Sequence, residues 1–251
     1  MLEILNYLLL GIGVGLLSSF LGFGGGTVMV PFLPLIAGLD IKTAIATSLS
    51  VVTLNAFNNT IDFHRKKLVP WKLVIKISAA SVVFGVLSSL VSNQLDEIAV
   101  RWSVIAVFTS VALISYLGPK RVPLFMRHNR LLNHLIAGVC AGIIAGLGGV
   151  GGATILVPLF LVAGWTENKE VAPAGNAINM LTSGVAVTTL ILNRQAVEWK
   201  AVLIILLSSI LVTYFARRKQ QFLSETTRRH LITSFLVMVI LLQVVTVLKK
   251  S

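Results

Sequence analysis

The chain has 251 residues, of which 56% are hydrophobic and 12% are charged, and its formal net charge is +12. Soluble domains carry about 25% charged residues. A mean hydropathy of +0.91 therefore leaves too little polar surface to cover a water-soluble fold, and most of the chain is expected to lie in lipid. The high apolar content excludes disorder, and a single cysteine, Cys140, excludes a disulfide scaffold.

The nine acidic residues each lie beside a break between apolar runs, and none lies in the middle of a run. Thirteen of the 21 Lys and Arg residues fall in three short segments, 65–72, 120–130 and 217–229. Cations near helix ends set membrane orientation, so these segments are predicted to be cytoplasmic loops. The same placement explains the basic balance without nucleic acid, because no basic face or RNA-binding motif accompanies the charge. We therefore expect no nucleic-acid partner.

The apolar runs divide into full-length spans and two longer, interrupted regions. A spanning helix needs about 20 mostly apolar residues. Six runs are predicted to be spans, and they cover roughly residues 45–63, 73–91, 98–117, 171–192, 201–215 and 231–248. Residues 4–39 and 135–165 are each too long for one span, and glycine clusters interrupt them.

The two interrupted regions are copies of one segment, offset by 127 positions. Eight of 21 positions are identical between residues 11–31 and 138–158, among them Gly22 with Gly149 and Pro31 with Pro158. The chain is therefore predicted to consist of two membrane repeats, residues 1–125 and 126–251, in one integral membrane domain. The copy in mid-chain cannot be a cleaved signal peptide, which argues against that interpretation of residues 4–21.

These elements predict an all-α polytopic membrane protein with two pseudo-symmetric repeats, each an interrupted glycine-turn hairpin followed by three transmembrane helices. If each interrupted region enters and leaves on one side, the halves are inverted, and the loops at Arg65, Lys120 and Arg217 are all cytoplasmic. If each region crosses the membrane once instead, the basic loop at 217–229 lies outside the cell, which contradicts the preference of Lys and Arg for cytoplasmic loops. We favour the inverted arrangement, which places Lys249 and Lys250 outside.

The glycine clusters 22–26 and 148–152 predict turns inside the membrane, because four of the five residues in each are glycine. A Thr and then a Pro follow each cluster, which is typical of the start of a helix. A half-helix that begins at membrane depth presents unpaired N–H groups and the positive end of its dipole to an oxyanion. Two such ends would face a shared central site. The more widely spaced glycines, such as Gly11 and Gly15, are predicted to serve close helix packing.

Polar residues follow the half-helices in the next spans. Asn176, Asn179 and Ser183 share one helix face, where they serve either as interhelical contacts or as substrate ligands. No Asp, Glu, Arg or His occupies the centre of a predicted span, and the sequence has no metal-ligand cluster and no candidate Ser/His/Asp set at membrane depth. We therefore expect a transporter rather than an enzyme, with no catalytic residues, no metal and no cofactor.

The glycine segments resemble those of the TauE/SafE family of sulfite exporters, also called the TSUP permeases. The resemblance rests on Gly-Phe-Gly-Gly-Gly-Thr at 22–27 with Val-Pro at 30–31, on Ala-Thr-Ser at 46–48, and on the repeat at 142–158. It implies a multi-pass plasma-membrane permease for small sulfur-containing oxyanions or organosulfonates, such as sulfite. The second half has Pro-Ala-Gly at 173–175 in place of Ala-Thr-Ser, so a site that uses Thr47 and Ser48 is asymmetric.

The leading hypothesis is transport of a small anion across the lipid bilayer, with backbone N–H groups and polar side chains forming the site. The predicted substrate-binding residues are Gly24, Gly25, Gly26, Thr27, Thr47, Ser48, Gly151, Gly152, Thr154, Asn176 and Asn179. Import or export, the coupling ion and the oligomeric state stay open. The alternatives are a permease for another small organic anion and a non-transporting membrane scaffold or assembly factor, which predicts no substrate-dependent stabilisation.

Overall fold

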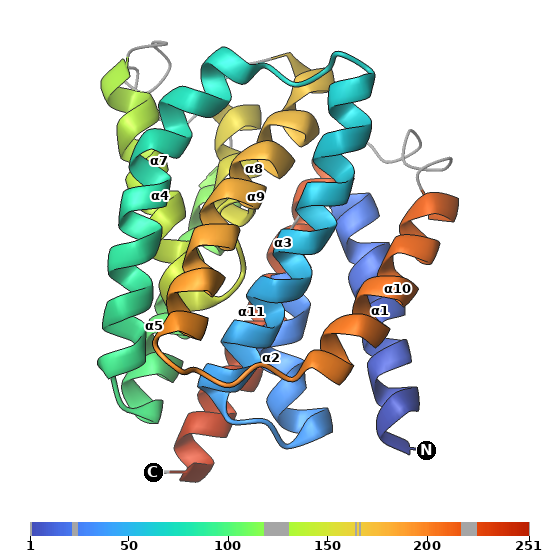
Figure 1. The fold of residues 1–251 in the computed structure, drawn as a ribbon, viewed down its shortest axis with the longest axis vertical. Helices are drawn as coiled ribbons and strands as arrows, with labels where there is room; N and C mark the ends of the chain where they lie inside the picture. The colour runs from blue at the N-terminus through green and yellow to red at the C-terminus, as the bar shows by residue number, and fades with distance from the viewer. Residues whose placement is uncertain are drawn as a thin grey trace.

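The computed structural model describes residues 2–21, 25–117, 131–163, 165, 167–216 and 225–250. Within these ranges every regular element is an α-helix, and the helices form a bundle with both chain ends at the same end (Figure 1). The predicted all-α fold is confirmed. The helices are α1 (Leu2–Leu21), α2 (Gly26–Ala37), α3 (Ile41–Arg65), α4 (Trp71–Gln94), α5 (Glu97–Leu117), α7 (Leu131–Gly148), α8 (Ala153–Ala163), α9 (Asn168–Leu192), α10 (Trp199–Ala216) and α11 (Glu225–Lys250).

Three of the described helices are, by length and composition, long and apolar enough to cross a membrane: Trp71–Gln94, Leu131–Gly148 and Lys169–Leu192. The first and third contain the predicted spans 73–91 and 171–192. The second, α7, was expected only as one arm of a hairpin. Trp199–Phe215 and Thr233–Leu248, where two further spans were predicted, are apolar but shorter helices than these three. The predicted span 45–63 lies inside a continuous 25-residue helix, α3, whose Ser, Thr and Asn side chains make it more polar than a simple lipid-facing helix.

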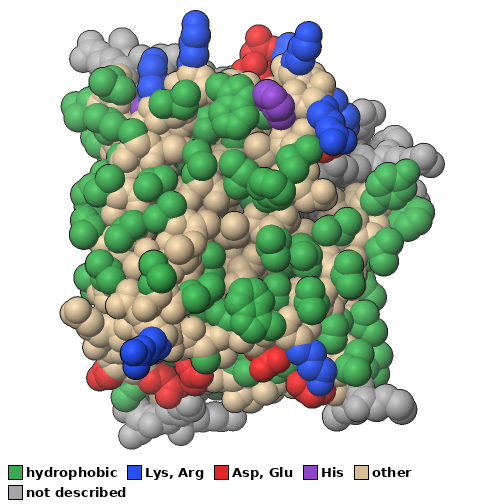
Figure 2. Space-filling model, viewed as in Figure 1, with side chains coloured by type: hydrophobic (Ala, Val, Ile, Leu, Met, Phe, Trp, Pro, Cys, Tyr) green, Lys and Arg blue, Asp and Glu red, His purple; other side chains and the backbone are tan. Residues whose placement is uncertain are grey.

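The outer surface of the bundle is apolar over its middle. Figure 2 shows hydrophobic side chains spread across the face between the two charged ends. Ile75 of α4 and Leu203, Leu207 and Leu211 of α10 are each at least 60% exposed. Exposed apolar surface of this extent is typical of contact with lipid. The chain is therefore a polytopic membrane protein.

Each half of the chain supplies a helix that packs along the first helix of the other half. The fourth helix, α4, packs along α7, and α10 packs along α1. Glycine makes both contacts close: a Cβ at Gly142 would lie 2.6 Å from the Ser81 carbonyl oxygen, and one at Gly15 would lie 2.8 Å from that of Ser209. The predicted packing role of these spaced glycines is confirmed.

Helices α3 and α9 pack together and run in opposite directions. Beyond the end of α9, Gln195 Nε2 donates to Oγ1 of Thr43, near the start of α3, over 3.4 Å. Nearer the other end, Asn59 Nδ2 of α3 donates to Asn176 Oδ1 of α9 over 3.0 Å. An antiparallel pair is what an inverted relation between the two halves requires.

The turns after α3 and α9 share one backbone conformation. Lys67 and Arg194, which are 127 positions apart, have φ angles of 56° and 61°, and no other described non-glycine residue has a positive φ. In both turns the next amide donates to the carbonyl oxygen five residues earlier, over 3.0 Å. The two turns are thus built alike at positions that the sequence offset relates, while the division into repeats 1–125 and 126–251 stays a prediction.

The two ends of the bundle differ in charge. At the end that carries the α3–α4 turn, basic side chains predominate, and at the end where α1 begins, acidic side chains gather (Figure 2). The first end has Arg65, Lys66 and Lys67 in one turn, and the other has Asp40 before α3 and Asp96 before α5. By the positive-inside rule this asymmetry favours a cytoplasmic position for the α3–α4 turn.

Candidate functional site

The connection between α7 and α8 is a tight turn inside the bundle, and glycine makes it possible. Gly149 and Gly151 have φ angles of +67° and +80°, where a side chain is strained. The Gly149 amide donates to the Ala145 carbonyl oxygen over 3.0 Å, which ends α7. A Cβ at Gly152 would lie 3.1 Å from that of Ala141, so α8 begins by running back along α7 (Figure 1). The predicted turn of the second half is confirmed.

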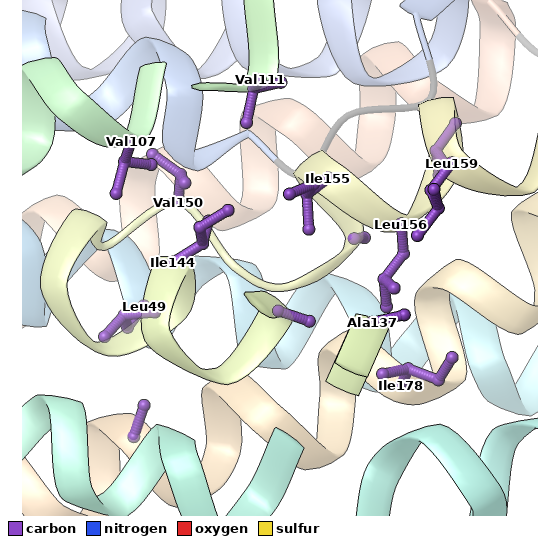
Figure 3. Packing of buried hydrophobic residues seen from close by; sticks show 14 of the residues in the cluster. Leu49, Val107, Val111, Ala137, Ile144, Val150, Ile155, Leu156, Leu159 and Ile178 are labelled. Carbon is purple, nitrogen blue, oxygen red and sulfur yellow. The ribbon is translucent and has the colours of Figure 1, made fainter. Parts of the chain in front are cut away.

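Val150 fixes this turn in the hydrophobic core. Its side chain is fully buried. Figure 3 shows it close to Val107 of α5 and Ile144 of α7, with Ile155 and Leu156 following on α8. Burial of a valine side chain contributes about 1.5–3 kcal/mol. Apolar packing therefore holds one residue of the turn, while its glycines lie against α3 and α9.

The two glycine-rich segments meet in the interior of the protein. A Cβ at Gly26, the first residue of α2, would lie 2.5 Å from Val150 Cα and 2.8 Å from the Gly149 carbonyl oxygen. Gly25, Gly26 and the predicted ligand Thr27 are all buried. The predicted residue Gly24 lies outside the described residues. The start of α2 therefore lies against the α7–α8 turn, so that the two glycine segments are in contact.

Two predicted hydroxyl groups bind the carbonyl oxygens of the α7–α8 turn. Ser48 Oγ of α3 donates to the Gly149 oxygen over 2.7 Å, and Thr154 Oγ1 donates to the Val150 oxygen over 3.0 Å. Both side chains are fully buried. A buried carbonyl oxygen without a donor is costly, so these bonds stabilise the turn. Ser48 and Thr154 thus support the site through its backbone.

Asn179 approaches the turn from α9. Its side chain is buried, and its Oδ1 accepts from the Ala153 amide over 3.3 Å and from Ser183 Oγ over 3.1 Å. The first bond caps the start of α8, where helix amides have no partner within the helix. Oδ1 is therefore occupied, and the amide nitrogen of Asn179 is the part of the side chain left for a ligand.

Several hydrogen-bond donors at this place have no acceptor among the described residues. They are the backbone N–H groups of Val150, Gly151 and Gly152 and the Nδ2 group of Asn179. Buried N–H groups are nearly always paired in folded proteins. The side chains identified around the turn include no Asp, Glu, Lys, Arg or His. The arrangement can therefore bind a ligand rich in acceptor oxygens through neutral dipoles.

Two predicted site residues lie away from the turn. Thr47 is fully buried, and its Oγ1 accepts from the Glu198 amide over 3.0 Å, which joins α3 to the α9–α10 connection. Asn176 accepts from Asn59 and donates from Nδ2 to the Ala172 carbonyl oxygen over 2.9 Å. The structure gives Asn176 the interhelical contact, the first of the two roles that the sequence allowed.

Two apolar residues that border the turn were not predicted. A Cβ at Gly149 would lie 2.9 Å from Ile45 Cγ1, and one at Gly151 would lie 2.9 Å from Val52 Cγ1 and close to Asn179 Oδ1. Both side chains are apolar, whereas the predicted ligands are glycines and polar residues. A signal existed in the offset of 127 positions, which pairs Val52 with Asn179.

Comparison with known proteins agrees with this architecture. A sequence model of the family described as "Sulfite exporter TauE/SafE" matches residues 7–243, from α1 to α11. A probable membrane transporter protein of Methanocaldococcus jannaschii is 28% identical over 195 residues, which cover 75% of this chain and 73% of the relative. Another from Haemophilus influenzae is 27% identical over 190 residues, covering 71% and 68%. A third, from Xylella fastidiosa, is 24% identical over 182 residues, covering 70% and 69%. The chain belongs to the TauE/SafE family of membrane transporters.

Proposed function

We propose that this transporter is a plasma-membrane permease for small sulfur-containing oxyanions or organosulfonates, and that it binds the anion where α2 and α8 begin. One observation carries the proposal. The two glycine segments meet in the protein interior, with Gly26 against Val150, beside a group of N–H donors that have no described acceptor. The family description names sulfite, which has the acceptor oxygens that such donors suit.

The chemistry of the site suits an anion that must be released again. The N–H groups of Gly151 and Gly152 and the Nδ2 group of Asn179 supply donors, and the helix dipoles of α2 and α8 supply partial positive charge. None of these groups carries a full charge. Ions that must leave as well as enter are best bound by such moderate interactions.

The apolar border of the turn suits the carbon part of a sulfonate. Ile45 and Val52 of α3 lie against Gly149 and Gly151. Ligand sites combine a few placed polar groups with apolar walls. A sulfonate group at the donors would place its carbon substituent within reach of these two side chains.

We infer that the two halves act as inverted units around this site, with the α3–α4 turn in the cytoplasm. Two observations support this inference. Helices α3 and α9 pack antiparallel, and each half packs one helix against the first helix of the other half, α4 against α7 and α10 against α1. Rocking of inverted halves around a fixed central site is a common route to alternating access.

A ligand panel on the purified protein tests the substrate class. The thermal midpoint is measured with sulfite, thiosulfate, sulfoacetate, sulfate and acetate at equal ionic strength. We expect sulfite or an organosulfonate to raise the midpoint more than acetate, because binding to the folded state alone stabilises it. Stabilisation by acetate with none by the sulfur anions would instead identify a permease for another organic anion. No shift with any anion, together with no uptake into proteoliposomes, would contradict transport at this site.

A further inference from the structure

The turn between α3 and α4 presents a group of exposed cations. Arg65 ends α3, Lys66 and Lys67 follow it in the turn, and Lys72 is the second residue of α4. All four side chains are exposed. Of the four, only Lys66 has an acidic partner among the described residues, Asp62, whose Oδ2 lies 2.9 Å from Lys66 Nζ. The other three positive charges are therefore open to a ligand.

A contact between two rings joins the helix ends at this turn. Trp71, the first residue of α4, donates from Nε1 to Nδ1 of His64 over 3.2 Å, and the rings meet edge to face. Because an indole nitrogen can only donate, Nδ1 of His64 accepts, and the proton of the neutral imidazole lies on Nε2. His64 is exposed, so its Nε2–H group is a further donor beside the cations.

The start of α4 places these donors at a membrane surface. Trp71 begins the segment Trp71–Gln94, which is long and apolar enough to span a membrane. The Trp71 side chain is 37% exposed, and Ile75, one turn further along α4, is 65% exposed. Tryptophan at the end of a span is typical of the level of the lipid head groups. A lipid whose head group contacts the cations would lay its acyl chain along Trp71 and Ile75.

The similar turn after α9 shows that this backbone conformation does not need a group of cations. Arg194 has the left-handed conformation of Lys67, but both of its neighbours in the chain are uncharged. Lys200, the second residue of α10, is already paired with Glu3 over 3.0 Å. The same turn thus forms with one unpaired cation in place of three, and the excess charge at the α3–α4 turn is available for binding.

We propose that the α3–α4 turn binds the head group of an anionic phospholipid such as phosphatidylglycerol. Arg65, Lys67 and Lys72 supply charged donors to the phosphate oxygens. The Nε2–H group of His64 supplies a neutral donor. Basic groups next to a span attract anionic lipids in this way. A phosphatidylethanolamine head group offers the same phosphate without net charge, so it binds more weakly at this turn.

Native mass spectrometry of the full-length protein measures the selection. The protein is delipidated in detergent, and phosphatidylglycerol, phosphatidylethanolamine or phosphatidylcholine with matched acyl chains is added. We expect the wild type to retain phosphatidylglycerol about fivefold better, or more, than either neutral lipid, since one cation near an anionic surface contributes about this factor. Lys67→Gln should lower retention of phosphatidylglycerol about fivefold and leave the other two lipids unchanged.

Arg194→Gln is the matched control, because it removes one charge at the equivalent position of the similar turn. It should retain phosphatidylglycerol as the wild type does. A variant with Arg65→Gln, Lys67→Gln and Lys72→Gln together should lose the preference for the anionic lipid. Because all these side chains are exposed, the thermal midpoints in detergent should stay at the wild-type value.

Equal retention of phosphatidylglycerol and phosphatidylethanolamine by the wild type would overturn the proposal. So would an equal loss in Lys67→Gln and Arg194→Gln, since the lipid would then respond to the total charge of the chain rather than to this turn. Free glycerol phosphate provides a further arm. If it displaces the lipid at micromolar concentration, the turn recognises a soluble phosphate, and the lipid assignment is wrong.

Discussion

The Ser48 hydroxyl donates a 2.7 Å hydrogen bond to the carbonyl oxygen of Gly149, and so joins α3 to the α7–α8 turn 101 positions further along the chain. Both residues are buried. The bond fixes the peptide group of Gly149. Its carbonyl oxygen is bound by Ser48, and the N–H groups that follow in the turn do not donate to it. The orientation of the proposed anion site thus depends on a side chain from the other half of the protein.

Ser48→Ala should destabilise the protein by about 1–3 kcal/mol, because it leaves the buried Gly149 oxygen without its donor. Unfolding by sodium dodecyl sulfate in mixed micelles measures the change. Ser50→Ala is the matched control on the same helix. Its hydroxyl bonds only the Ala46 oxygen one turn back, so its loss should cost less. Equal costs for the two variants would argue against a supporting role for Ser48.

Asn179→Asp should weaken anion binding by about tenfold or more while the protein stays folded. The new side chain keeps an oxygen for the Ala153 amide but replaces the Nδ2 donor with an acceptor, which repels an anion when it is ionised. Isothermal titration with the best anion of the panel measures the affinity. Asn193→Asp, at the exposed end of the same helix, should bind as the wild type does. Unchanged affinity in Asn179→Asp would remove this residue from the site.

Gly142→Ala should destabilise the α4–α7 contact by about 1–3 kcal/mol, because its Cβ would lie 2.6 Å from the Ser81 carbonyl oxygen. Gly13→Ala is the opposite case, since nothing lies within 4 Å of its Cβ and alanine favours the helix by up to about 1 kcal/mol. The thermal midpoint should therefore fall in the first variant and hold or rise in the second. A fall of similar size in both would contradict close packing as the reason for Gly142.

Cysteines at positions 66 and 193 should lie on opposite sides of the membrane. Lys66 and Asn193 are exposed, and the 127-residue offset places them at equivalent points of the two similar turns. Lys66→Cys and Asn193→Cys are made separately in a Cys140→Ser background and labelled in intact cells with a membrane-impermeant maleimide. We expect Cys at 193 to react from outside and Cys at 66 to react only after lysis. Reaction of both from outside would exclude an inverted relation.

Local patterns in the sequence predicted the local features of the fold. Glycine clusters and apolar runs placed the turn at 149–152 and the spans in α4 and α9, because backbone freedom and hydropathy depend on a few adjacent residues. The pairing of α4 with α7 was not predictable in the same way. The pairing depends on which helix faces made of small residues pack together, and Gly142 and Ser81 lie far apart in the chain.

The candidate site was predicted only in part for the same reason. The buried environment of Ser48, Thr154 and Asn179 at the turn follows from tertiary contacts, although their residue types marked them as polar groups in apolar helices. Residue type did not separate Thr47 from Ser48. One side chain contacts the α9–α10 connection and the other contacts the glycine turn, because neighbouring positions on a helix point about 100° apart.

The most direct test of anion binding at the joined glycine segments is uptake of radiolabelled sulfite by proteoliposomes that contain Gly152→Leu. A Cβ at position 152 would lie 3.1 Å from that of Ala141, so a leucine side chain would force the start of α8 away from α7. Gly13→Leu, with open space around its Cβ, is the control for insertion and folding. We predict uptake by the wild type and by Gly13→Leu and none by Gly152→Leu at equal reconstituted amounts. Undiminished uptake by Gly152→Leu would show that the anion does not pass this turn.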